Sequence, residues 1–217
     1  VLAITSKIVS ICEGRVLKVG TVSKDDLVKK EAEYYLPPDN KYHFYLTIKN
    51  NILTATAGID ESNGNGYYIL WPRNPQETAN RVRQYLSRRF SLKFVGVIIT
   101  DGRTIPLQWG VTGRAVTHSG FVALNDYRGK PDIFGRKLKV TQVNVMDGLA
   151  AAAVLAMGEG REQTPLALLE DLSFVQFQQR NPTKKALESL KISLEEDLYS
   201  FLLKSVKWRK GEQKSAS

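Results

Sequence analysis

The segment KFVGVIIT, residues 93–100, constrains the fold of this chain more than any other feature. Its β-branched and aromatic residues favour a strand. Its hydrophobicity is nearly continuous, without the alternation of a half-exposed strand, which indicates that both faces of the strand are covered. We expect this buried strand to end at Asp101.

Helices and further strands surround this segment without a fixed order. Helices are predicted over residues 23–36, 74–90, 145–157 and 183–210, from N-cap signals, alanine content and apolar stripes. Strands are expected near residues 1–5, 15–20, 43–60, 111–124 and 165–170. Because the order is not a steady alternation of strand and helix, we expect an α+β fold with mixed and antiparallel sheets and packed helices, not a doubly wound sheet.

The composition bounds the class of protein. The 217 residues are 42% hydrophobic, which is enough for a substantial core. A single cysteine, Cys12, excludes an internal disulfide and suits a reducing cytosol, so we expect a cytoplasmic protein with Cys12 as a small buried residue. No apolar run reaches the roughly 18–20 residues of a membrane helix. The chain starts without methionine or a secretory signal, so we expect it to lack its true N-terminus.

The net charge of +9 would attract partners that carry phosphate groups. Basic residues concentrate in RVRQYLSRR, residues 81–89, and in KSVKWRKGEQK, residues 204–214. A general nucleic-acid binder would be expected to interleave such patches with exposed aromatic residues or to carry a known reader motif. Since the sequence indicates neither, a nucleic-acid partner is not expected.

The segment GIDESNGNG, residues 58–66, has two interpretations. Asn and Gly tolerate positive φ, so the segment could be only a surface turn. Alternatively, Asp60 could be a metal ligand at a strand end, because Asp101 and Glu159 are predicted in the same setting, next to a glycine-bearing loop. Neither GxxxxGK[ST] nor a strand-GxGxxG-helix is present, so any nucleotide site must use other residues.

Five blocks, in this order and at these intervals, give the chain a resemblance to a known family. They are ITSKIVSICEGRV, AGIDESN, GVIITDGR, DYRGKPDIFGRKLKVT and MDGLAAAAVLAMGEG. This pattern resembles the coenzyme F420-0:γ-glutamyl ligase family, often called CofE-like, over roughly residues 1–173. The resemblance implies an α+β fold in an intertwined homodimer, with GTP as co-substrate and Mg²⁺ or Mn²⁺ as cofactor, in a two-metal site.

The resemblance also implies roles for particular residues. It implies that the metal ions are bound by Asp60, Asp101 and Glu159. It implies that the nucleotide is contacted by Ser6, Lys7, Asn63, Met157, Gly158 and Gly160. Substrate or phosphate contacts are expected from Arg103, Arg128 and Lys130.

The predicted reaction joins the amine of L-glutamate to a substrate carboxylate through an acyl phosphate, at the expense of GTP or ATP. The acceptor stays open between a coenzyme F420 precursor and a folate-like molecule. The predicted domains are a ligase domain over residues 1–173, with its N-terminal segment missing, and a C-terminal amphipathic helix and basic tail over residues 174–217. His43 and His118 are expected to be structural, since neither falls in a block of the resemblance.

Two alternatives remain. In one, the protein binds nucleotide without turnover, because Ile11 and Gly102 stand where the family commonly has a lysine and a threonine. In the other, which only the charge supports, it is an RNA-associated basic protein.

Overall fold

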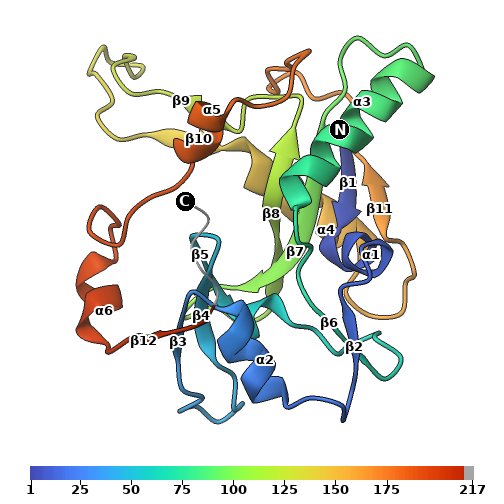
Figure 1. Cartoon of the computed structure of the whole chain (residues 1–217). Helices are drawn as coiled ribbons and strands as arrows, with labels where there is room; N and C mark the ends of the chain where they lie inside the picture. Colours follow the sequence, from blue (N-terminus) through green and yellow to red (C-terminus); the bar gives the residue numbers. More distant parts are fainter. Residues whose placement is uncertain (213–217) are drawn as a thin grey trace. The chain divides into compact units, whose positions relative to one another are not determined.

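The computed structural model describes residues 1–212, and the chain divides into two compact units (Figure 1). The first unit comprises Val1–Val9 and Asn74–Leu190, and the second comprises Ser10–Arg73 and the chain from Lys191 onward. Helix α1 (Ser6–Cys12) contains the point where the chain passes from one unit to the other. Both units mix helices and strands, which confirms the expected α+β class. The predicted domain division at residue 173 stays a prediction.

A four-stranded mixed sheet forms the centre of the first unit. Its strands, in spatial order, are β11 (Leu166–Leu168), β1 (Leu2–Thr5), β7 (Val97–Thr104) and β8 (Val111–Ser119). Strand β1 runs parallel to β7, and the other two pairs are antiparallel. Val97, Ile98 and Ile99 are completely buried, which confirms that both faces of this strand are covered.

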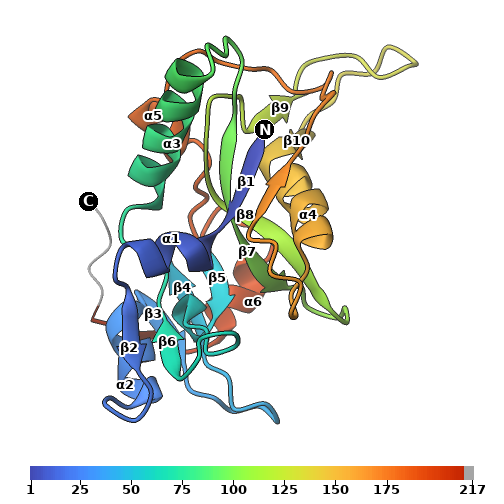
Figure 2. The same ribbon diagram turned by 90° about the vertical axis from the view of Figure 1, so that its right-hand side faces the viewer.

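Two helices cover the two faces of this sheet (Figure 2). Helix α3 (Pro75–Arg89) packs on the side chains of Val97 and Ile99. Helix α4 (Val145–Met157) packs on that of Ile98, which points to the opposite face. The predicted boundaries of these two helices are confirmed to within a residue.

The first unit also contains three short elements at its periphery. Strands β9 (Leu124–Asp126) and β10 (Gln142–Asn144) pair antiparallel and carry a long loop between them. Helix α5 (Lys184–Glu188) follows near the end of the unit.

The second unit is built on antiparallel strands. One sheet has the order β12 (Arg209–Lys210), β3 (Tyr34–Leu36), β4 (Leu46–Lys49) and β5 (Ile52–Ala55), and a second pairs β2 (Val16–Lys18) with β6 (Tyr67–Ile69). Helix α2 (Lys24–Glu31), the 3₁₀ turn η1 (Thr56–Gly58) and helix α6 (Ser200–Ser205) complete the unit. The core of this unit includes Val28, Ala57 and Leu70.

Three expectations were wrong. The helix predicted over residues 23–36 ends at Glu31, and Tyr34–Leu36 forms a strand because it pairs with β4. The long helix predicted over residues 183–210 is broken into α5, α6 and β12, and Ser193 accepts a hydrogen bond from the backbone of Glu196 where the helix would have continued. Cys12 is exposed, not buried. The end of the expected basic tail, residues 213–217, lies outside the described residues.

In the part of the chain that the structure covers, none of the helices combines the length and the hydrophobicity that a membrane span requires.

Candidate functional site

Ser6 and Asp101 are far apart in the sequence and adjacent in the first unit. Strand β1 pairs in parallel with β7, and this pairing aligns Thr5 with Thr100. The next residue of each segment, Ser6 and Asp101, therefore lies beside the other. The hydroxyl of Ser6, the first residue of α1, donates a hydrogen bond to Oδ1 of Asp101 over 3.4 Å. Ser6 is buried, and Asp101 is half-buried. Strand β7 continues to Thr104, so Asp101 lies inside the strand and not at its end, as was expected.

Glu159 reaches the same part of β7 from the end of α4. The helix ends at Gly158, whose φ of +78° turns the chain, and Glu159 follows directly. A Cβ atom at Gly102 would lie 3.2 Å from Oε1 of Glu159 and 2.8 Å from Val111. The absence of a side chain at residue 102 therefore makes room for the Glu159 carboxylate beside the strand that carries Asp101.

Two arginines and an aspartate surround this position, and of these Arg114 and Asp147 were not assigned from the sequence. Arg114 lies opposite Asp101 in the pairing of β7 with β8. Burial lowers the pKa of the Arg114 guanidinium, although the charges of Asp147 and Asp101 act against this. Arg103, predicted to contact substrate or phosphate, donates from Nη1 to Asp147 over 3.0 Å, and Asp147 also accepts from the backbone of Ala115 over 2.8 Å.

Asp147 could have been found from the sequence by its place in the first turn of the predicted helix. Asn144 caps α4 by accepting a hydrogen bond from the backbone of Asp147, which fixes Asp147 in the first turn. The Nε atoms of Arg103 and Arg114 are buried and have no hydrogen-bond partner within residues 1–212. Buried donors of this kind are rare in folded proteins, so these two have hydrogen-bonding capacity left for an anion.

The segment after α4 forms a tight turn held by Glu162. The backbone of Gly160 donates to Oε2 of Glu162 over 2.8 Å, and a Cβ atom at Gly158 would clash with the same side chain. The side chain of Met157 packs in the core of the first unit, and its carbonyl accepts a hydrogen bond from Thr164. Sequence reasoning missed Glu162, which shapes the segment predicted to contact nucleotide.

Asp60 and Asn63 belong to the second unit. Asp60 pairs with Ile69 through two backbone hydrogen bonds, and its carboxylate accepts from the backbone and the hydroxyl of Ser62, both over 2.8 Å. Asn63 is exposed and has a φ of +53°. The loop therefore does use Asn and Gly for turn geometry, as the simpler interpretation required, and at the same time it holds the Asp60 carboxylate in a defined position.

A turn with unusual backbone geometry precedes Asp60. Thr56, Ala57 and Gly58 all have positive φ, of +48°, +53° and +70°. Such a conformation is unfavourable for a β-branched residue, so surrounding contacts must hold it. The buried hydroxyl of Thr47 accepts a hydrogen bond from the backbone of Ala57 over 2.9 Å, and the ring of Trp71 occupies the space beside Gly58.

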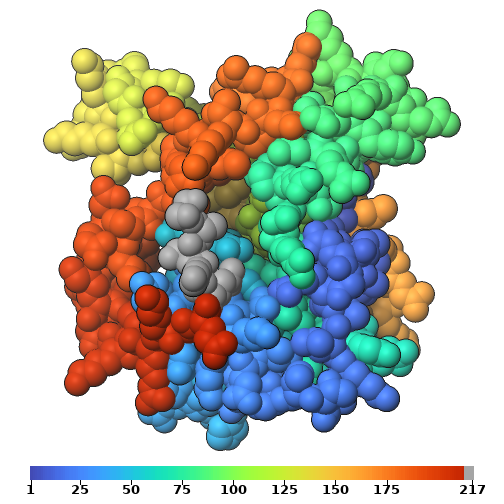
Figure 3. Space-filling view, in the orientation of Figure 1, coloured from blue at the N-terminus to red at the C-terminus, as the bar shows by residue number. Residues whose placement is uncertain are grey.

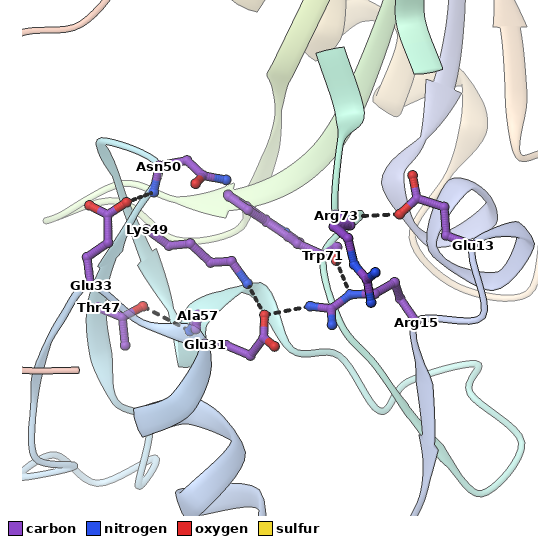
Figure 4. Close-up of polar contacts among 10 residues, drawn as sticks. All are labelled: Glu13, Arg15, Glu31, Glu33, Thr47, Lys49, Asn50, Ala57, Trp71 and Arg73. Atoms are coloured by element: carbon purple, nitrogen blue, oxygen red, sulfur yellow. Dashed lines mark hydrogen bonds and ion pairs between the residues drawn. The ribbon is translucent and has the colours of Figure 1, made fainter. Parts of the chain in front are cut away.

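A partly buried charge network lies near this turn in the second unit (Figure 4). Glu31 accepts from Lys49 over 2.7 Å and from Arg15 over 2.6 Å. Burial alone would raise the pKa of the Glu31 carboxyl, but the two cations outweigh it and the pKa is lowered. Arg15 also donates from Nε to the carbonyl of Trp71 over 3.2 Å. The network thus connects α2 and β4 to the segment that carries Trp71.

The remaining candidates are more exposed. Arg128 pairs with Asp126 over 2.7 Å, and the ammonium of Lys130 lies 5.0 Å from the centre of the Tyr127 ring. Lys7 lies half-buried in α1.

The predicted metal ligands are thus divided between the units, with Asp101 and Glu159 in the first and Asp60 in the second. Neither unit by itself, within its described residues, holds three or more His, Cys, Asp or Glu side chains placed to bind one metal ion. The joint role of the three carboxylates stays a prediction.

Comparison with known proteins identifies the family. The family model described as F420-0:Gamma-glutamyl ligase matches residues 1–171. A coenzyme F420:L-glutamate ligase of Methanopyrus kandleri is 36% identical over 193 residues, which are 79% of this chain and 75% of that protein. A protein of the same name from Archaeoglobus fulgidus is 31% identical over 189 residues, 80% of this chain and 76% of that protein. One from Methanocaldococcus jannaschii is 39% identical over 121 residues, 56% of this chain and 48% of that protein. The resemblance noted in the sequence is confirmed: the chain belongs to the F420-0:γ-glutamyl ligase family.

Proposed function

We propose that the protein is a γ-glutamyl ligase that joins the amine of L-glutamate to a carboxylate of a coenzyme F420 precursor. Family membership and the names of the relatives support the reaction class. The single structural observation that carries the proposal is the position of Glu159 beside Gly102, next to Asp101 on the same strand.

Two carboxylates in one place fit a hard divalent cation. Mg²⁺ and Mn²⁺ prefer oxygen ligands, and Asp101 and Glu159 offer them in the first unit. When bound, such ions would neutralise the charge of the nucleotide phosphates, so that a negatively charged substrate could approach them.

The reaction we propose has two steps, with GTP as the expected nucleotide and ATP as the alternative. The acceptor carboxylate attacks the γ-phosphorus, the bond to the β-phosphate oxygen breaks, and an acyl phosphate and a nucleoside diphosphate form. The amine of glutamate then attacks the acyl carbon, phosphate leaves, and the amine loses a proton to solvent. Both steps handle anions.

Cationic side chains near Asp101 are suited to such anions. Arg103 and Arg114 place buried Nε donors close to Asp101 and Asp147, where they could orient a phosphate or carboxylate oxygen. In the first unit, Gly158 and Gly160 provide backbone that can approach phosphates closely, and Ser6, which donates to Asp101, is followed by Lys7 in α1. In the second unit, exposed Asn63 is the candidate for a nucleotide contact. Arg128 and Lys130, in the loop after β9, are the candidates for contact with the acceptor.

We also propose that the active form is a homodimer. Several large apolar side chains of the first unit, in the β7–β8 loop, in the β9–β10 loop and on α4, are almost fully exposed, and exposed apolar surface of this kind often marks an interface. They are Leu107, Trp109, Ile133, Phe134, Val140 and Leu155. A second copy of the chain would cover such a surface.

The test is a panel of carboxylate acceptors incubated with L-glutamate, GTP or ATP, and Mg²⁺ or Mn²⁺, and analysed by mass spectrometry for added glutamyl units. Asp101→Asn should abolish addition, because the amide keeps the shape and loses the charge. Asp171→Asn is the matched control. Asp171 is exposed in the same unit, and its backbone bonds to Ser173, not to Asp101 or Glu159. Equal activity of both variants would refute the assignment of Asp101.

Calorimetric titration with nucleotide distinguishes the alternative of an inactive homologue. Metal-dependent nucleotide binding without addition of glutamate to any acceptor would favour that alternative.

A further inference from the structure

The surface of α3 carries a feature that the proposed ligase reaction does not use. The inner side of this helix is fixed to its own unit by Ala79, Val82 and Leu86, which pack on the sheet, and by the buried side chain of Arg83. Arg83 donates to Asn181 over 2.6 Å and to the hydroxyl of Ser119 over 3.2 Å. Gly120 leaves the space that the Arg83 side chain fills. The helix is therefore held firmly, and its outer side is a rigid platform.

The outer side of α3 is strongly basic and hollowed. A hollow of about 480 Å³ is lined by Arg81, Gln84, Tyr85, Arg88 and Arg89. None of its arginines lies within ion-pair distance of a carboxylate among residues 1–212. The one acid of the helix, Glu77, is in its first turn, away from Arg88 and Arg89. Figure 3 shows α3 and the residues after it, in green, as an open part of the surface.

Exposed aromatic rings lie among these charges. Tyr85, Phe90 and Phe94 are 61%, 58% and 56% exposed. The guanidinium of Arg89 lies 5.6 Å from the centre of the Phe90 ring, and the ammonium of Lys93 lies 5.4 Å from that of Phe94. The expectation that residues 81–89 lack exposed aromatic neighbours was wrong, because the helical periodicity brings Tyr85 into the hollow with the arginines and Phe90 lies beside Arg89.

We propose that this surface, formed by α3 and the residues up to Phe94, binds single-stranded nucleic acid. Arginine and lysine would neutralise successive phosphates, while exposed rings would stack with unpaired bases. From Arg81 to Arg89 the helix rises about 12 Å, which is enough for a short stretch of an extended strand. Tyr85 lines the same hollow as three arginines, and the Arg89 guanidinium lies over the Phe90 ring. Positive charge next to exposed rings matches a chain of phosphates with unpaired bases, and we infer nucleic acid from that combination.

The test is the fluorescence anisotropy of a labelled single-stranded oligoribonucleotide titrated with the full chain at several salt concentrations. Four phosphate contacts, by Arg81, Arg88, Arg89 and Lys93, would give a slope of log K against log salt of about −3, at about −0.7 per contact. An unlabelled duplex of the same sequence should compete poorly, because its bases are not free to stack.

Two sets of variants separate charge from stacking. Arg88→Gln with Arg89→Gln should make the salt slope shallower by about 1.4, whereas Lys184→Gln with Lys185→Gln, an equal change of charge on exposed α5, should leave it unchanged. Tyr85→Ala should weaken binding about fivefold or more without changing the slope. Phe201→Ala is its control, since Phe201 is also an exposed ring and belongs to the second unit.

Several results would overturn the proposal. An equal loss of binding in the α5 variant would mean that only net charge matters. Poly-glutamate that competes as well as the oligonucleotide, with no effect of Tyr85→Ala, would assign the surface to an acidic protein. A change of the sedimenting mass in the Arg88→Gln and Arg89→Gln variant would assign it to a second copy of the chain. Circular dichroism of each variant verifies that the fold is intact.

Discussion

His118 provides a test of the packing of the first unit that needs no substrate. The side chain is 3% exposed and packs edge-on against Phe121, with 5.1 Å between ring centres. Its Nδ1 has no hydrogen-bond partner within the described chain. Burial lowers the pKa of His118 from 6.5 to about 4, although a hydrogen bond between the imidazole and the Phe121 backbone, which favours the protonated ring, acts against this. His118 is therefore neutral in the folded protein at pH 7, as a structural histidine should be.

The stability of the protein should depend on pH through this residue. Below pH 6.5 the unfolded chain binds a proton at His118 and the folded protein does not, so stability is lost as the pH falls from 6.5 towards about 4. The total loss is about 3 kcal/mol, and about 2 kcal/mol of it falls between pH 7 and pH 5. Below about pH 4 the residue contributes no further change.

The assay is urea unfolding, followed by circular dichroism, of the wild type and of His118→Leu at both pH values. The wild type should lose about 2 kcal/mol more than the variant between pH 7 and pH 5, while carboxylates and other groups cancel in the comparison. His43→Asn, which removes the exposed histidine, is the control and should behave as the wild type. An equal pH dependence in wild type and His118→Leu would refute the argument that His118 is buried and neutral.

Three further predictions concern the second unit and the assembly. Gly58→Ala should lower the free energy of unfolding by at least about 2 kcal/mol, because the new methyl group would lie 2.2 Å from a tryptophan ring at a φ of +70°. Gly66→Ala, at a φ of +84° with open space around it, should lower it by only about 1–2 kcal/mol. Equal costs of the two substitutions in urea unfolding would contradict the crowding at Gly58. Glu31→Gln should cost about 3–5 kcal/mol, because it leaves the buried Lys49 without its carboxylate, and the exposed control Glu61→Gln should cost less than about 1 kcal/mol in the same experiment. Sedimentation velocity should give twice the chain mass of 24.3 kDa, and a single species at 24.3 kDa would count against the homodimer.

The parts of the fold that the sequence predicted well are those where one local signal dominates. Helix α4 was predicted from residue 145 to 157 because alanine favours helices, and in the structure Asn144 and Gly158 cap its two ends. Helix α3 begins at Pro75 as its N-cap and N1 residues require. The burial of β7 followed from a hydrophobic run that no amphipathic element would have.

The parts that failed depend on contacts between distant residues or on competition within the backbone. Tyr34–Leu36 has the composition of a helix end, yet it pairs with β4 and β12, which local propensity cannot show. The leucine stripe from residue 187 onward suggested one long helix. Hydroxyl and carboxylate side chains such as Ser193 and Asp197 instead bond to nearby backbone, and the segment breaks into short pieces.

In the candidate site too, contacts between distant residues decide the outcome, and they change the interpretation of Gly102. Gly102 was interpreted as the loss of a hydroxyl group that could bind metal, and hence as a reason to consider an inactive homologue. In the fold, a side chain at this position would press on Val111 and on the carboxylate of Glu159. Because the pairing of β7 with β8 and the end of α4 together define this space, no reading of residues near 102 alone could reveal it. The glycine removes one oxygen donor from the strand and admits another from a distant helix end, so the departure from the family pattern is compatible with a working site.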